Sequence, residues 1–193
     1  MNKNALILGG RINKDDDVAE QALLLVTDGL TARDWAMTTI QLHELAIAPC
    51  LGCFGCWTKT PGECVIDDAG RDVAKSIVQS DLVVYLTPIL FGGYSFELKK
   101  AIDRSIPIIS PMFRKVRGEV HHKKRYAHYP RVLALGWMER RNTDEKDVFQ
   151  SVVQRNAINM YAPKAVAEIL VSGGDLETMK QRVERALSEV VGS

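Results

Sequence analysis

The sequence predicts an α/β protein in which a parallel sheet is covered by helices on both faces. Two observations lead to this prediction. Short, continuous apolar runs recur along the chain, and the clearest is residues 82–86, Leu-Val-Val-Tyr-Leu. Between these runs lie longer segments with apolar residues at helical spacing, most regularly over residues 176–190. Continuous apolar runs are typical of strands buried on both faces, and their alternation with helices indicates βαβ units.

Five segments are predicted to be strands. The first ends at two glycines, Gly9 and Gly10, and the second alternates apolar and polar residues as an edge strand does. The third is expected to stop at Leu86, because Pro88 follows and proline cannot continue a central ladder. The predicted strands are residues 4–10, 36–43, 82–86, 131–136 and 165–171.

Five helices are predicted to follow these strands. The three aspartates at 15–17 place carboxylates in the first turn of the first helix, which suits the helix dipole. Asp67 and Asp68 are expected to cap the second helix. Residues 106–130 are expected to be irregular and basic. The helices are predicted to begin near Asp15, Asp67, Ser95, residue 144 and Leu176.

Five parallel strands favour the flavodoxin-like order 2-1-3-4-5, in a three-layer sandwich with helices on both faces. In such sheets ligands bind beyond the carboxyl ends of the strands. We therefore expect the loops that start at Gly9, Pro88 and Gly136 to form one site, with residues 50–64 at the same edge. The chain has no internal repeat or linker, which predicts a single domain over residues 1–193 with a cysteine-rich loop at 49–66.

The composition excludes several classes of function. The formal net charge of the 193 residues is +1, so no global field attracts nucleic acid or a membrane surface. No apolar run approaches the ~20 residues of a membrane span, and the N-terminal run is too short for a signal peptide. A cytoplasmic protein is therefore expected. No Ser/His/Asp set, Walker loop or G-x-G-x-x-G motif stands out.

All four cysteines fall in one short stretch, with the spacing Cys50-x2-Cys53-x2-Cys56-x7-Cys64. In a reducing compartment such a cluster indicates metal or redox chemistry. The compact x2 spacing is typical of ferredoxin-type ligation of a [4Fe–4S] cluster, whereas structural zinc sites usually use two separated pairs. A redox-active pair at 50/53 or 53/56, or free thiols in a lid loop, are the other interpretations.

Several motifs, taken together, resemble one known family. They are the cysteine motif followed by Val65-Ile66-Asp67-Asp68, then Ser80-Asp81-Leu-Val-Val, Thr87-Pro88-Ile89-Leu90-Phe91-Gly92, Leu98-Lys99 and Asp103-Arg104. In this combination the chain resembles the iron–sulfur flavoprotein branch of the NAD(P)H-dependent FMN reductases. The similarity runs from the first strand to about residue 105, and beyond that only the fold pattern agrees.

The resemblance implies an FMN-dependent oxidoreductase that takes electrons from NAD(P)H and passes them to an unknown acceptor, with a [4Fe–4S] cluster on the four cysteines. It implies no catalytic side chain, because the cofactor carries the chemistry. Members of this family suggest a homodimer or homotetramer. The residues implied in flavin binding are Pro88, Ile89, Leu90, Phe91 and Gly92 after the third strand, Gly136 and Trp137 after the fourth, and Gly10, Arg11 and Asn13 after the first.

The first loop departs from the family pattern. The hydroxyl-bearing residues that usually bind the FMN phosphate are missing, and three aspartates stand at 15–17 in their place. Each like charge near the phosphate opposes binding by about 1 kcal/mol at a surface. The alternative function is therefore a flavodoxin-fold binding or scaffold protein that has lost FMN, with a structural metal or free thiols in the cysteine loop.

Overall fold

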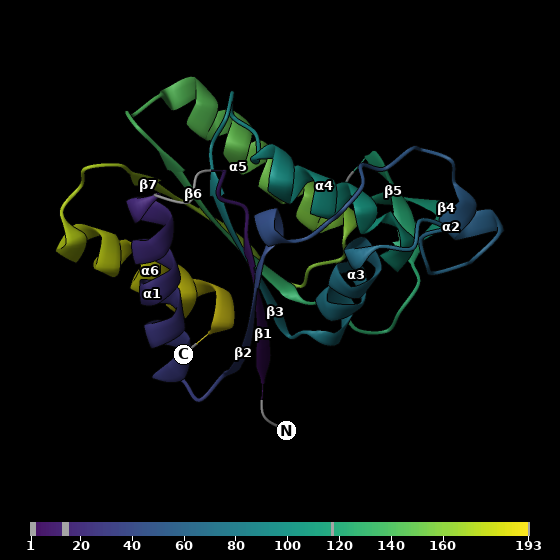
Figure 1. Ribbon diagram of the computed structural model, residues 1–193, viewed down its shortest axis with the longest axis horizontal. Helices are drawn as coiled ribbons and strands as arrows, with labels where there is room; N and C mark the ends of the chain where they lie inside the picture. The colour runs from purple at the N-terminus through teal and green to yellow at the C-terminus, as the bar shows by residue number, and fades with distance from the viewer. Residues whose placement is uncertain (1–2, 13–15, 117, 193) are drawn as a thin grey trace.

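The computed structural model describes residues 3–12, 16–116 and 118–192. Five parallel strands form the central sheet in the order β2-β1-β3-β6-β7 (Figure 1). The order confirms the predicted 2-1-3-4-5 arrangement, because β6 and β7 are the fourth and fifth strands of this sheet. The strands are β1 (Asn4–Gly9), β2 (Ala36–Gln41), β3 (Leu82–Pro88), β6 (Arg131–Met138) and β7 (Ala165–Val171).

Helices cover both faces of the sheet and create two separate apolar cores (Figure 1). Helices α1 (Asp17–Thr31) and α6 (Leu176–Val191) pack on one face. Helices α3 (Ala69–Gln79), α4 (Phe96–Arg104) and α5 (Thr143–Asn159) pack on the other. No helix in the described part of the chain is long and apolar enough to cross a membrane.

The helix starts follow from local capping chemistry. Asp16, Asp68 and Ser95 each accept a backbone hydrogen bond at the N-terminus of α1, α3 and α4. These contacts satisfy N–H groups that have no partner inside the helix. The prediction that Asp68 caps α3 is therefore confirmed, whereas Asp67, also expected to cap it, pairs with Arg71. Asp16, expected within the first turn of the first helix, is its N-cap, and Asp15 lies outside the described residues.

The third strand extends through Pro88, two residues further than expected. Strand β1 ends at Gly9, where the Gly10 N–H donates to the Leu86 carbonyl, while the Ile89 N–H donates to Trp137 on the other side. Residues along a strand alternate between the two neighbours, so the nitrogen of Pro88 faces the side where β1 has already ended. No ladder bond is lost, and proline is tolerated there.

Residues 106–130 are more regular than expected. A short 3-10 turn, η2 (Ile106–Ile108), leads into an antiparallel hairpin of β4 (Ile109–Val116) and β5 (Glu119–Lys124). Its basic residues hold it against the body of the protein, since the Arg114 guanidinium and Lys124 ammonium lie over the ring of Tyr161 at 4.7 and 5.2 Å. The hairpin lies beside the cysteine loop at one end of the molecule (Figure 1).

Candidate functional site

Two regions contain the residues that sequence reasoning selected. One is the carboxyl edge of the sheet, where the loops after β1, β3 and β6 meet. The other is a cavity around the four cysteines. Strand topology alone positions the carboxyl edge.

A tight turn follows β3 at this edge. The Leu90 N–H donates to the Gly93 carbonyl at 3.1 Å, and the Gly93 N–H donates back to Leu90 at 2.8 Å. The two central residues both have positive φ, 51° at Phe91 and 75° at Gly92, as a type I′ turn requires. Such a φ suits glycine but strains phenylalanine. The turn thus holds Phe91 at its tip, 97% exposed.

The other residues of this turn face inward. Ile89 is buried, and a Cβ at Gly136 would lie only 2.7 Å from its Cδ1. Gly92 is also buried, and a Cβ there would lie 2.7 Å from Val148 on α5. Pro88 is half-buried. Of the five residues expected to contact a flavin at 88–92, the structure therefore exposes Leu90 and Phe91.

The loop after β1 approaches the N-terminus of α1, the usual place for a phosphate. In this structure the Asp16 carboxylate already occupies that place. One of its oxygens accepts the Ala19 N–H at 3.1 Å, and the other accepts the indole N–H of Trp137 at 3.1 Å. The carboxylate thus caps the helix and ties it to the end of β6.

The remaining predicted residues of the first loop lie around this cap. Gly10 is buried, and a Cβ there would lie 2.9 Å from Ser95 Oγ. Arg11 pairs with Glu20 at 3.3 Å, and Asn13 lies outside the described residues. The adjacent cavity, lined in part by Gly9, Gln41 and Trp137, measures about 20 Å³. That volume holds about one water molecule.

The four cysteines all line one cavity of about 480 Å³. Cys50 and Cys53 are exposed at its rim, Cys64 is half-buried and Cys56 is buried. Burial, followed by the charges of the other three thiols, raises the pKa of Cys56. Trp57 of the same loop adds to the lining, and the other walls come from distant segments. They include Arg104, Ile109, His122, Asn156 and Met160.

The thiols surround this cavity without closing into a ligand set. Within the described residues, no three His, Cys, Asp or Glu side chains lie close enough together to hold a metal ion. Short helix α2 (Gly55–Thr58) places Cys56 on the inner side of the loop. Positive φ angles of 63° at Gly52 and 55° at Phe54 bend the chain around it.

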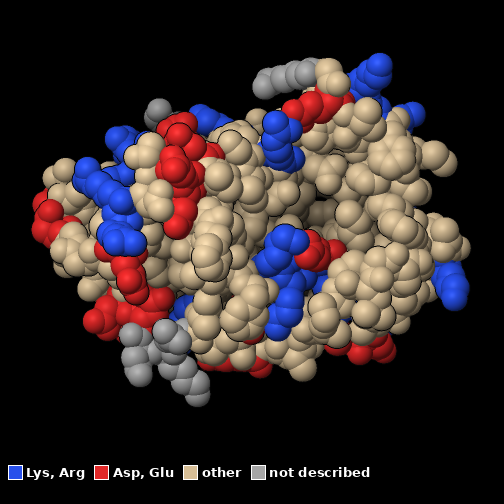
Figure 2. Space-filling model, turned by 90° about the horizontal axis from the view of Figure 1, so that it is seen from above, with Lys and Arg blue, Asp and Glu red and all other residues tan. Residues whose placement is uncertain are grey.

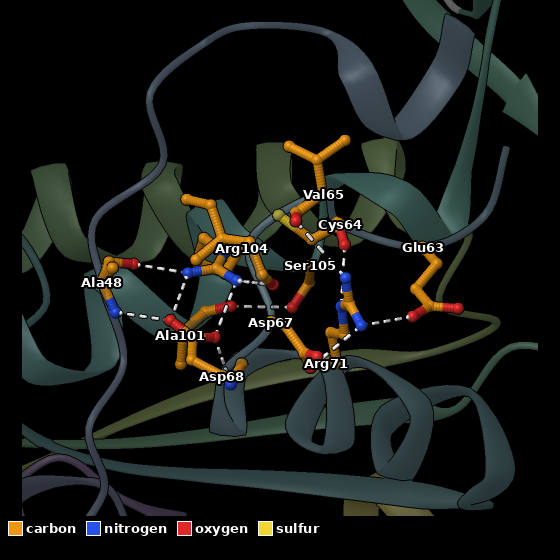
Figure 3. A network of polar contacts seen from close by, with 12 residues as sticks. Ala48, Glu63, Cys64, Val65, Asp67, Asp68, Arg71, Ala101, Arg104 and Ser105 are labelled. Atoms are coloured by element: carbon orange, nitrogen blue, oxygen red, sulfur yellow. Dashed lines mark hydrogen bonds and ion pairs between the residues drawn. The ribbon is translucent and has the colours of Figure 1, made fainter. Parts of the chain in front are cut away.

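An ion pair between the fully buried Arg104 and the half-buried Asp68 holds both ends of the cysteine loop (Figure 3). Arg104 donates to both carboxylate oxygens of Asp68, at 2.7 and 2.8 Å. It also donates to the carbonyls of Ala48, before the loop, and Ile66, after it, at 2.8 and 3.1 Å. Asp68 in turn accepts the Ala48 N–H at 2.8 Å. The loop therefore begins and ends on one charge pair.

Both charges of this pair are favoured by their surroundings. Burial works to raise the pKa of the Asp68 carboxyl, but the hydrogen bonds from Arg104, Ala48 and Gly70 outweigh it and the pKa is lowered. Burial likewise works to lower the pKa of Arg104, but Asp68 and the Cys64 side chain outweigh it and the pKa is raised. The pair therefore stays charged beside the thiols.

A second arginine anchors the middle of this segment. Arg71 donates to the carbonyl of Cys64 at 2.8 Å and to that of Val65 at 3.3 Å (Figure 3). Its charge is matched by ion pairs with Glu63 and Asp67, both at 2.9 Å. Arg71 thus fixes the backbone at Cys64, whereas Arg104 lines the cavity together with the Cys64 side chain.

Four rings contact one another in a row across the cysteine loop and the hairpin. Phe54 stacks on Trp57 at 5.4 Å, Trp57 contacts His122 at 4.8 Å, and His122 contacts Phe113 at 4.6 Å. The outer rings, Phe54 and Phe113, are exposed, as is Leu51 nearby. On the face that Figure 2 shows, most of the surface at this end of the molecule is uncharged. The rim of the cavity is therefore apolar.

The two regions are further apart than expected from the sequence. The cavity shares no lining residue with the turn at 88–93. Helix α4 begins at Phe96, just after the turn, and its first residue to line the cavity is Ile102, six residues or about 9 Å further along the helix. One side chain bridges part of this gap, because the Tyr94 hydroxyl accepts a hydrogen bond from Asn156 in the cavity wall at 3.4 Å.

Sequence reasoning missed several residues of the cavity. Arg104 belongs to a motif of the resemblance, but the sequence alone assigns it no role, and its burial and its pairing with Asp68 reveal one. His122 lies in the segment expected to be irregular. Asn156 and Met160 carry no sequence signal, because they reach the cavity only through the packing of the end of α5.

Comparison with known families agrees with this architecture. The family model described as NADPH-dependent FMN reductase matches residues 5–126. An iron-sulfur flavoprotein of Methanocaldococcus jannaschii is 36% identical over 69 residues, 36% of this chain and 35% of that protein. An iron-sulfur flavoprotein of Methanosarcina thermophila is 28% identical over 74 residues, 38% of each chain. The matched stretches thus span little more than a third of these relatives.

Solved structures share the fold over the whole chain. An NAD(P)H:quinone oxidoreductase from Methanothermobacter marburgensis aligns with a TM-score of 0.72 and 15% identity, over 100% of this chain and 98% of that one. An FMN-dependent NADH-azoreductase from Bacillus anthracis, solved with FMN, aligns with a TM-score of 0.65 and 14% identity over 100% of both chains. At this identity the likeness shows the fold alone.

Proposed function

The chain belongs to the NADPH-dependent FMN reductase family, and from this premise we propose that it is an FMN-dependent oxidoreductase that takes electrons from NAD(P)H. We further propose that the electrons leave through a [4Fe–4S] cluster on Cys50, Cys53, Cys56 and Cys64. The observation that carries the second step is that all four thiols line one cavity of about 480 Å³.

The turn after β3 fits the flavin ring. Leu90 and Phe91 offer exposed apolar surface to a ring face, and Phe91 is held in a strained conformation that its own packing does not explain. Backbone strain at an exposed residue is common where a ligand is bound. When bound, FMN supplies hydride acceptance from the nicotinamide and release of single electrons. The chain's part is to position the ring and to cover one side of it.

The phosphate end fits less well. The Asp16 carboxylate caps α1 where the phosphate would gain most from the helix dipole, and the neighbouring cavity of about 20 Å³ is too small for a phosphate. FMN binding therefore requires the Asp16 side chain to turn away. We propose that the flavin is held mainly by its ring and is exchangeable.

The donor set of the cavity fits an iron–sulfur cluster. Four thiolates are the usual ligands, and the buried Arg104 offsets part of their negative charge. In the described conformation the two outer thiols stand at the rim, so the loop must draw Cys50 and Cys53 inward on metal binding. Zinc on the same thiols is the competing occupant, and iron analysis separates the two.

The Asp16 cap also favours the alternative function, a flavodoxin-fold binding or scaffold protein that has lost FMN. The decisive experiment is the visible spectrum of anaerobically purified protein, with assays of iron and sulfide and a titration with FMN. The proposed enzyme predicts a flavin spectrum on titration and iron with sulfide in the cavity. Colourless protein that binds no added FMN would rule out the flavoenzyme.

Replacing Phe91 separates ligand binding from stability. Phe91→Asn creates the Asn–Gly pair that type I′ turns prefer, so we expect a gain of about 1 kcal/mol in the free energy of unfolding. The same change removes the exposed ring, so FMN affinity should fall at least threefold. Urea unfolding and FMN fluorescence quenching measure the two effects. A variant that binds FMN as well as the wild type would show that Phe91 does not contact the flavin.

Replacing one thiol tests the cluster. Cys53→Ala should lower the iron content after anaerobic reconstitution by at least half, because an incomplete ligand set releases its cluster. Leu51→Ala is the matched control, since Leu51 lies exposed in the same loop, 73% accessible, and carries no ligand atom. Full iron content in Cys53→Ala would contradict the ligand assignment.

A further inference from the structure

The guanidinium of Arg104 has five N–H donors, and the protein uses four of them. Nη1 donates to Ala48 and Asp68, and Nη2 donates to Ile66 and Asp68. The fifth donor, Nε–H, is buried and has no hydrogen-bond partner among the described residues. An unsatisfied buried donor is destabilising, and more so on a charged group, so it needs an explanation.

The position of Arg104 suggests what the fifth donor is for. The side chain has no exposed surface, and it lines the cavity together with all four thiols. Cys64 is the thiol best placed to accept a hydrogen bond from this donor, because the same guanidinium donates to the carbonyl of Ile66, two residues after Cys64, and both side chains line the cavity. The guanidinium also packs against Gly70, where a Cβ would lie 3.2 Å from Cζ. Packing and pairing thus fix the guanidinium in place.

We infer that Arg104 is a positioning residue of the redox site, whose Nε–H donates a charge-assisted hydrogen bond to the Cys64 sulfur when that sulfur is a thiolate ligand. The inference rests on the proposed cluster. Hydrogen bonds to ligand sulfurs and nearby positive charge raise the reduction potential of an iron–sulfur site. Reduction adds one electron, and hence one negative charge, beside a fixed cation. Arg104 therefore makes the site easier to reduce.

The test compares reduction potentials in reconstituted protein. Removing Arg104 alone would leave Asp68 buried without its partner, so the central variant is Arg104→Gln in an Asp68→Asn background. Relative to Asp68→Asn alone, it should lower the ratio of reduced to oxidised cluster at a fixed solution potential at least tenfold, which is 59 mV for a one-electron couple. Arg104→Lys keeps the charge without the Nε donor and should shift the ratio in the same direction by less.

Arg71→Gln is the matched control, because Arg71 holds the carbonyl of Cys64 and its charge is already paired. A merely structural role for Arg104 predicts that Arg71→Gln shifts the potential as much as the Arg104 variants do. Two results would overturn the inference. One is a shift in Arg71→Gln equal to that in the Arg104 variants. The other is a ratio of reduced to oxidised cluster in the double variant that lies within twofold of the ratio in Asp68→Asn. Wild-type protein that takes up no iron would overturn the proposed cluster, and the inference with it. The iron assay detects this result independently of the potential measurement, so the two failures can be told apart.

Discussion

The Asp16→Ser variant should bind FMN at least tenfold more tightly than the wild-type protein. Asp16 places a negative charge at the N-terminus of α1, where the FMN phosphate would lie. At 4 Å and an effective dielectric constant of 20, two unit charges repel by about 4 kcal/mol, and a tenfold change needs only about 1.4 kcal/mol. Serine caps helices as well as aspartate does, so α1 keeps its start. Quenching of FMN fluorescence measures the affinity.

The control for this variant is Asp17→Asn. Asp17 is exposed in the first turn of the same helix, so its replacement changes the net charge equally without vacating the helix end. We expect its affinity for FMN to change less than threefold. The gain in Asp16→Ser should also shrink at high salt, because salt screens charges near the surface. Equal affinities of the wild type and both variants would show that the cap does not compete with the phosphate.

Most of the fold could be predicted from the sequence because its signals are local. An apolar run such as residues 82–86 indicates a buried strand without knowledge of its neighbours, and Asp68 or Ser95 marks a helix start through contacts within three residues. The hairpin of β4 and β5 gave no such signal. Its strands are rich in Lys, Arg and His, and they are held by Tyr161 and the cysteine loop rather than by an alternating apolar pattern.

The site was less predictable because it depends on contacts between distant residues. The topological rule fixes where strands end, and it located the turn at 88–93. It does not fix the path of a long loop, and the loop at 49–66 runs to the ends of α4 and α5 instead of to the carboxyl edge. That path depends on the ion pair between Arg104 and Asp68. The two residues are 36 positions apart, and no local sequence pattern around either residue predicts that they pair.

Replacing Asp68 should produce the largest loss of stability. Asp68→Ala leaves the fully buried Arg104 without its carboxylate, and removing one partner of a buried pair costs about 3–5 kcal/mol. The change also removes the cap of α3 and the anchor of the Ala48 N–H. Urea unfolding should therefore show a midpoint far below that of the wild type. Asp103→Ala is the control, because its pair with Lys99 is exposed and worth about 0–1 kcal/mol.

The same pair should make the protein sensitive to acid. The folded state lowers the pKa of Asp68, so its stabilising contribution is fully present above the ordinary value of about 3.9 and is lost as the pH falls through the lowered value. As the pH decreases, the free energy of unfolding of the wild type should therefore approach that of Asp68→Ala. The difference in unfolding free energy between the control Asp103→Ala and Asp68→Ala should narrow as well. Suppose that the difference in unfolding free energy between the wild type and Asp68→Ala stays constant as the pH falls below the lowered pKa of Asp68. Asp68 would then stabilise the loop through its shape and not through its charge. In that case the ends of the cysteine loop would be held by hydrogen bonds alone, and the cation beside the thiols would lack the fixed partner that keeps it in place.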